Sequence, residues 1–374
     1  GKTDEEIDEI FIQGKLSDAL VNRLEVYLDM VHYPIAVRSS SLLEDSQAQP
    51  LAGVYRTFML PNNHTDKLHR LRQLMDAIKL VFSSVYLSDA RNFLEALSFK
   101  AEEEKMAVII QETVGCLQGG HYYYPHISGV AQSYNFYPTS HMTHTDGIAN
   151  IALGLGKSVV EGKLNYRFCP RYPEMDMLPQ QEMMRTSQKE FYALDLSRND
   201  FDLTQGEEIT LEKLYLKDAD KHGTLRFIAS VWDYENYRLT DNLEEKGMKV
   251  LTFANILKYN YFPLAKIVEE LLEIGEIALG IPVEIEFAVN LDFEKSHANK
   301  PTFYILQIRP LSVSTDAYHI DSEKLDKNSL LMYTEHGMGN GVIEELKDVI
   351  YLDPACFDKT MTHKMQDEIE VFNH

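Results

Sequence analysis

The spacing of apolar residues along the chain predicts three helical stretches. Residues 4–32 are expected to be helical, because leucines and isoleucines alternate there with acidic and polar residues. Residues 66–97 carry apolar side chains three or four positions apart, as one face of a helix requires. The clearest pattern covers 263–279, where Gly280 is expected to cap the helix and Pro282 prevents its continuation.

Short apolar runs predict strands. Pro34–Val37 is interpreted as a buried strand that ends at Arg38, and a serine-rich, turn-like stretch follows over 39–53. Met106–Gln111 has the continuous apolar character of a fully buried strand, and Ile127–Gln132 is a further strand.

Two more strands are predicted further along the chain, at Val283–Asn290 and Thr302–Pro310, with a polar loop between them. The charged stretch 175–248 has no clear period, and its elements stay unassigned at this point.

The strand at 283–290 alternates between acidic and apolar positions, so that Glu284 and Glu286 share one face. Gln307 and Arg309 share a face of the following strand in the same way. If the two strands pair as a hairpin, two carboxylates, an amide oxygen and a guanidinium converge, which suits Mg²⁺ with a polyphosphate. The alternative is a half-exposed strand face that carries a surface salt bridge to Arg309.

A second group of candidate residues follows the first predicted strand. Arg38 and Ser39 begin a run of hydroxyls and backbone N–H groups that suits an anion, and a guanidinium matches phosphate geometry. Gly53 and Thr57 lie where a loop could close over phosphates. The alternative is a run of serines that caps a helix, with Arg38 paired to the acidic residues that follow.

Two other motifs give weaker evidence for a functional site. The segment 154–158 (Gly-Leu-Gly-Lys-Ser) fails the phosphate-loop pattern, because Ile151 stands where the first glycine belongs, and it is interpreted as a tight turn that opens a helix. The histidines at 121–126 and 141–144 have no acidic residue or cysteine at ligand spacing and are interpreted as loop residues.

Composition narrows the class of protein. The 374 residues, 44% of them hydrophobic, are enough for two or three subdomains. A formal net charge of −22 disfavours nucleic acid as a partner. The chain has no apolar run of membrane-spanning length, no secretory signal and no starting methionine, so we expect a trimmed piece of a cytoplasmic protein with no membrane partner. Its three cysteines are far apart, as is typical of free thiols.

Taken together, six segments resemble the N-terminal ATP-binding domain of the phosphoenolpyruvate synthase and pyruvate phosphate dikinase family. The family patterns are V-R-S-S-x-x-x-E-D with A-G and T-F, then M-A-V-x-V-Q, S-G-V, G-L-G-E-x-V-V-x-G, D-I-E-W-A and I-L-Q-T-R-P. They match, in the same order, the segments 37–45 with 52–53 and 57–58, 106–111, 128–130, 154–162, 284–288 and 305–310.

The resemblance implies an α+β, ATP-grasp fold in which ATP binds between two lobes. The first lobe is expected over 1–100 and the ATP-binding lobe with the metal-site strands over 101–312. A linker and the start of a phosphohistidine-type swivelling domain are expected over 313–374, where residues 330–352 resemble the opening strands of that domain.

The resemblance also assigns roles to individual residues. Arg38 and Arg309 would act on the phosphates as catalytic residues, and Glu286 and Gln307 would hold Mg²⁺. The nucleotide itself would be bound by these residues: Arg38, Ser39, Gly53, Thr57, Gln111 and Glu284.

The implied reaction is that of a pyruvate, water dikinase. ATP gives a pyrophosphoryl group to a histidine on the protein's own phosphohistidine domain, which is expected outside this chain, and the β-phosphoryl group then reaches pyruvate on a third domain. The resemblance is also compatible with a homodimer, in which a second copy of the chain is a partner.

Two departures from the family pattern keep alternatives open. The 36 residues before Val37 contain no counterpart of the family's G-G-K lysine loop, and Lys157 stands where the family has glutamate. A dikinase with another acceptor and a non-catalytic nucleotide-sensing module therefore remain alternative functions.

Overall fold

The computed structural model describes residues 2–41, 54–96, 104–139, 141–160, 162–241, 247–291 and 300–311, together with 243, 313, 329–332 and 351. The chain divides into two compact units, Gly1–Val313 and Ser314–His374. Nearly all of the segment 330–352, where the start of a swivelling domain is predicted, lies outside the described residues. The first unit is a mixed α+β structure with several antiparallel sheets.

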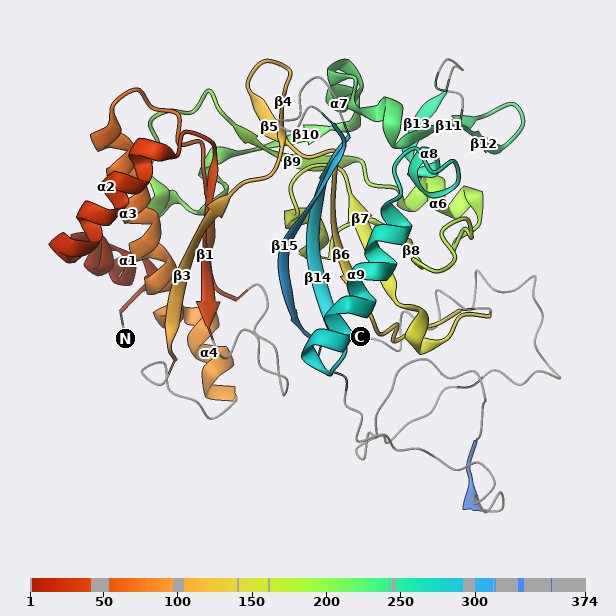
Figure 1. Ribbon diagram of the computed structural model, residues 1–374, viewed down its shortest axis with the longest axis horizontal. Coiled ribbons are helices and arrows are strands. Elements are labelled where there is room, and N and C mark those ends of the chain that lie inside the picture. Colours follow the sequence, from red (N-terminus) through yellow and green to blue (C-terminus); the bar gives the residue numbers. More distant parts are fainter. Residues whose placement is uncertain are drawn as a thin grey trace. The chain divides into compact units, whose positions relative to one another are not determined.

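The first sheet has the strand order β2-β1-β3 and packs against helices on one face (Figure 1). Leu28, Val37 and Leu74 are fully buried where helices and sheet meet. The elements are α1 (Asp4–Gln13), α2 (Asp18–Met30), β1 (Ile35–Ser41), β2 (Thr57–Leu60), α3 (Lys67–Ser83), η1 (Ser84–Tyr86), α4 (Ser88–Ala96) and β3 (Met106–Glu112).

The structure corrects the predicted helix over 4–32. Gly14 ends α1 in an extended conformation, and its N–H bonds back to the carbonyls of Ile10 and Phe11. The Ser17 side chain then accepts a hydrogen bond from the N–H of Leu20 and caps a second helix. The stretch at 66–97 is likewise divided, into α3, η1 and α4.

Two strand predictions in this sheet were also wrong in part. Strand β1 continues through the serines to Ser41 instead of turning after Arg38. Strand β3 is not fully buried, because it pairs with β1 alone and one of its faces is open, as the 42% exposure of Ile109 shows. Since β3 belongs to the first sheet, that sheet extends beyond residue 100.

The second large sheet has five strands in the order β15-β14-β6-β7-β8. Helix α9 lies along it (Figure 1), and its buried residues Val268 and Leu272 belong to the same core as Ile285 and Phe287. The elements are β6 (Ile127–Gln132), β7 (Ile148–Ala152), β8 (Tyr166–Phe168), α9 (Leu264–Leu279), β14 (Val283–Asn290) and β15 (Thr302–Pro310).

The predictions for this sheet are confirmed. The strands at 127–132, 283–290 and 302–310 have the predicted bounds, and β14 and β15 pair as an antiparallel hairpin. Helix α9 ends at Gly280, whose φ of 72° is the left-handed conformation that glycine adopts readily.

The stretch 175–248 is more regular than its sequence indicates. It contributes strands to two smaller sheets, β10-β9-β5-β4 and β12-β11-β13. The elements of this part and its neighbours are β4 (Cys116–Gln118), β5 (Tyr122–Tyr124), η3 (His144–Asp146), α5 (Lys157–Val160), α6 (Gln180–Thr186), β9 (Glu190–Asp195), η4 (Leu203–Gln205), η5 (Glu207–Thr210), β10 (Leu211–Tyr215), α7 (Leu216–His222), η6 (Thr224–Phe227), β11 (Ala229–Asp233), β12 (Arg238–Thr240), β13 (Met248–Leu251) and α8 (Ala254–Leu257).

Candidate functional site

A cavity of about 250 Å³ lies within the first unit, and most of its lining comes from segments that are far apart in the sequence. Strands β1, β2 and β3 contribute residues from the first sheet, and β6, β14 and β15 contribute residues from the five-stranded sheet. The rest comes from α5 and the turn before it, from η5 and the start of β10, and from loop residues next to β2, β3 and β6. Five of the predicted site residues line this cavity: Arg38, Thr57, Gln111, Glu286 and Arg309.

Arg38 connects the two sheets. Its Nη1 lies 3.3 Å from Oε2 of Glu286, and its Nη2 donates a hydrogen bond to Oε1 of Gln307. Glu286 and Gln307 are direct partners in the β14–β15 register, so their oxygen atoms meet on the same guanidinium. The alternative pairing of Arg38 with the acidic residues of its own loop concerns 44–45, which lie outside the described residues.

Arg309 and Glu284 form a second ion pair at the same edge. Arg309 donates to Oε1 of Glu284 through Nε, at 2.8 Å, and also through Nη2. Nε2 of Gln132 donates to the other carboxylate oxygen at 2.6 Å. Only 9% of the Glu284 side chain is exposed, so the alternative of a surface salt bridge on a half-exposed face does not hold.

A β-bulge sets the register of this hairpin. Glu286 pairs with Gln307 but Phe287 pairs with Ile305, which leaves Leu306 as an extra residue in β15. The side chain of Leu306 lines the cavity. The predicted convergence therefore occurs as two groups: the pair of Arg309 with Glu284, and Arg38 with both Glu286 and Gln307.

The other predicted residues are placed as follows. Thr57 stands opposite Arg38 in the β1–β2 register, and its backbone N–H donates to Oε1 of Glu207. Gln111 stands opposite Ala36 on β3. Ser39 is 4% exposed and alternates with Arg38 along β1, so it faces the helices and not the cavity. Gly53 lies outside the described residues.

Two charged residues that line the cavity were not predicted as site residues from the sequence. Lys157 lines it at the start of α5, and its Nζ lies 3.3 Å from Oε1 of Glu208. Glu207, the neighbour of Glu208 on η5, lines the cavity as well. The only sequence signal for Lys157 was its departure from the family glutamate, and η5 lies in the stretch whose period is unclear.

The cavity is thus lined by cations that already have partners within the protein. Arg38 is paired with Glu286, Lys157 with Glu208, and Arg309 with Glu284. Among the described residues no three histidine, cysteine or acidic side chains are grouped so that they could hold a metal ion by themselves. A metal ion at this site would need additional ligands from a bound molecule.

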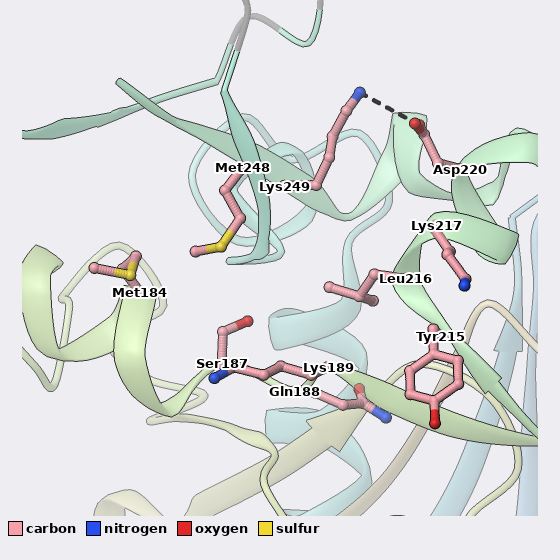
Figure 2. Close-up of a pocket in the computed structure, with 10 residues that line it drawn as sticks. All are labelled: Met184, Ser187, Gln188, Lys189, Tyr215, Leu216, Lys217, Asp220, Met248 and Lys249. Carbon is pink, nitrogen blue, oxygen red and sulfur yellow. Dashed lines mark ion pairs between the residues drawn. The ribbon is translucent and has the colours of Figure 1, made fainter. Parts of the chain in front are cut away.

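Another cavity, of about 450 Å³, is drawn in Figure 2. It is lined by residues of α6, β10, α7 and β13 and by the segment between α6 and β9, and it shares no residue with the first cavity. Lys249 pairs there with Asp220 at 3.3 Å. None of the predicted site residues lies in it, so its larger volume does not make it the candidate site.

Largely buried arginines that meet carboxylates and an amide beside a cavity are the groups that suit a phosphorylated ligand. The chain belongs to the family of the pyruvate phosphate dikinase AMP/ATP-binding domain, whose family model matches residues 1–329. It is therefore an ATP/AMP-binding domain of the dikinase type, which places it among the kinases and transferases. No curated protein matches the chain. In the described part of the chain, no helix combines the length and the apolar character needed to cross a membrane.

Proposed function

We propose that this chain binds MgATP in the 250 Å³ cavity and is the ATP-grasp domain of a phosphoenolpyruvate synthase-like dikinase, a pyruvate, water dikinase. In this proposal the chain acts in the cytoplasm and passes a pyrophosphoryl group to a histidine on a swivelling domain. The single observation that carries the proposal is the meeting of Glu286 and Gln307 on Arg38.

The donor set fits a magnesium ion. Mg²⁺ prefers oxygen ligands and is commonly held by one or two carboxylates together with substrate phosphates. Glu286 and Gln307 offer a carboxylate and an amide oxygen that already lie close enough to share one cation, the Arg38 guanidinium. When bound, Mg²⁺ would neutralise charge on the phosphate oxygens.

The protein's own residues have separable roles in this proposal. Arg38 grips phosphate oxygens, because a guanidinium binds them bidentately. Gln111 lines the adenine pocket, and Thr57 contacts the nucleotide from β2. Lys157 supplies a second positive charge at the phosphates. Arg309 holds Glu284 in place and adds positive charge at the edge of the cavity.

Calorimetric titration tests the proposal. MgATP is titrated into the parent chain, into Glu286→Ala with Gln307→Ala, and into Glu270→Ala, which changes a carboxylate that is 60% exposed on α9. We expect binding to the parent and to the control, and a loss of about tenfold or more in the double variant, since each charge-assisted contact contributes on the order of 1.5–3 kcal/mol. Equal affinity in all three folded proteins would refute the metal-bridged site.

A second function, a nucleotide sensor without phosphoryl transfer, is favoured by one observation. Lys157 and Glu208 form an ion pair at the cavity, where the family pattern has glutamate in place of the lysine. The two functions differ in one measurement. Supplied with MgATP and a phosphohistidine domain of the family, a dikinase domain releases AMP and labels the histidine from β-labelled ATP, whereas a sensor binds ATP and does neither.

A further inference from the structure

A third cavity, of about 230 Å³, lies at the β8 edge of the five-stranded sheet and shares no residue with the candidate ATP site. Most of its wall is apolar. The apolar wall consists of Tyr166, Met177, Leu178, Met183, Leu251 and Phe253.

One cation, Arg167 of β8, lines this cavity. The only hydrogen bond that the Arg167 side chain makes within the described residues runs from Nη2 to Oδ1 of Asn135, at 3.2 Å. It has no carboxylate partner there. Asp176, next to Met177 in the chain, is paired with Lys258 at 2.9 Å instead.

Among the residues that the structure describes, two buried donors at or next to the cavity have no acceptor. They are Nε of Arg167 and Nδ2 of Asn135, whose Oδ1 is already used by Arg167 and by the N–H of Tyr137. Burial lowers the pKa of Arg167, because desolvation disfavours the charged form of the guanidinium. Arg167 as a whole is partly exposed, but its Nε is buried, and an anion that reached the guanidinium would supply the missing acceptor and a counter-charge.

The chain does not lack carboxylates that could have paired with Arg167, since it has 58 acidic residues against 36 lysines and arginines. The half-buried guanidinium nevertheless lines a cavity whose wall is mostly apolar. That combination is typical of a site in which the ligand supplies the negative charge and the apolar walls bind the rest of it.

We propose that this cavity binds a small monocarboxylate with a compact apolar or aromatic body, at a site separate from that of ATP. A single guanidinium matches one planar carboxylate in geometry and charge. A phosphate dianion would bring a second negative charge, for which the lining offers no second cation. The volume of about 230 Å³ accommodates a benzoate-sized molecule.

Benzoate and its neutral isostere benzamide are the probes for this site, added to the full chain while thermal unfolding and calorimetric binding are followed. We expect benzoate to raise the unfolding temperature with increasing concentration, as a ligand of the folded state does, and benzamide to have little effect. Arg167→Met should weaken benzoate binding about tenfold or more through the loss of the charge-assisted contact. Arg167→Lys, which keeps the charge but loses the planar fork, should bind benzoate with intermediate affinity.

Two further variants separate a binding role of Arg167 from a structural one. Leu178→Trp fills the cavity from a position that is 44% exposed and should abolish the response to benzoate while Arg167 is retained. Arg171→Met changes an arginine that is 59% exposed and paired with Asp146, and should leave the response unchanged. MgATP binding should be the same in all of these variants.

The free Arg167→Met protein gives an independent readout. Replacing a half-buried cation that has no carboxylate partner in the described residues by an apolar side chain should leave its unfolding temperature equal to or above that of the parent. The proposal is overturned if benzoate does not bind the parent, if benzamide acts as strongly as benzoate, or if Arg167→Met still responds. It is also overturned if both Arg167 variants lower the unfolding temperature and benzoate affects none of the three proteins. Arg167 would then serve only to hold Asn135.

Discussion

The ion pair between Arg309 and Glu284 offers the sharpest test of how the candidate site is held together. Both side chains are largely removed from water, with 17% and 9% of their surfaces exposed. Replacing Arg309 by Met would remove both of its hydrogen bonds to Glu284 and leave the carboxylate buried. We expect this substitution to lower the stability of the fold, in addition to any effect on nucleotide binding.

The size of this effect follows from the surroundings of Glu284. Removing one partner of a buried ion pair typically costs about 3–5 kcal/mol, because the remaining charge loses its compensation. Gln132 would still donate to Glu284 at 2.6 Å, so one hydrogen bond to the carboxylate survives. We therefore expect the lower end of that range, about 3 kcal/mol.

Urea unfolding followed by circular dichroism measures this change, and a double-mutant cycle assigns it to the pair. Glu284→Gln combined with Arg309→Met removes both charges and should recover about half of the loss or more. Lys266→Met is the control, because Lys266 and Glu270 are 75% and 60% exposed and 3.7 Å apart. That exposed pair should change stability by no more than about 0.5 kcal/mol.

The reasoning would be refuted by a loss below about 1 kcal/mol in Arg309→Met, which is the scale of an exposed pair. It would also fail if the double variant lost the sum of the two single losses, since the charges would then not be coupled.

Three further predictions concern single positions. Gly129→Ala should cost about 1–3 kcal/mol in urea unfolding, because a Cβ there would lie 2.8 Å or less from ring carbons of the buried Phe287. Gly280→Ala should cost about 1–2 kcal/mol in the same assay for a different reason, since its φ of 72° is strained for alanine although no atom lies within 4 Å of the added Cβ. Lys157→Met should weaken MgATP binding in calorimetry about tenfold or more, because it removes a cation that lines the cavity; Lys221→Met, at a lysine that is 72% exposed, should not.

The parts of the fold that the sequence predicts well are those whose signals are local. The period of two in 283–290 and the glycine and proline after 279 define a strand and a helix end without reference to the rest of the molecule, and both are confirmed. The hairpin that brings β14 and β15 together follows from two strands joined by one polar loop.

The errors arise where tertiary context decides. Strand β3 has a buried-strand sequence, but the face that carries Ala107 and Ile109 is not covered by packing and stays exposed. The serines after Arg38 favour a turn locally, yet pairing along β3 keeps them extended to Ser41. The role of η5 at the cavity could not be predicted, because Glu207 and Glu208 contact residues about 150 and 50 positions earlier in the chain.

In the proposed function, the internal ion pairs of the cavity's cations decide which cations can turn to the phosphates of ATP. A nucleotide that enters this acidic chain must draw cations away from their internal carboxylate partners. Glu208 is 59% exposed and Glu286 is 16% exposed, whereas only 9% of Glu284 is exposed. The carboxylate that returns to water most easily is therefore that of Glu208, and the pair that costs most to break is that of Arg309.

Lys157 and Arg38 should consequently turn to the phosphates, while Arg309 stays on Glu284. When Arg38 leaves, the oxygen atoms of Glu286 and Gln307 no longer have a cation between them. The negative charges of the Glu286 carboxylate and of the phosphates would then repel each other. A divalent ion at Glu286 would remove that repulsion, so ATP and Mg²⁺ should each strengthen the binding of the other by the same factor. Titration of ATP with and without Mg²⁺ measures this coupling, and Glu286→Gln should reduce it; equal ATP affinity in both conditions would show that Arg38 keeps its partners when ATP binds.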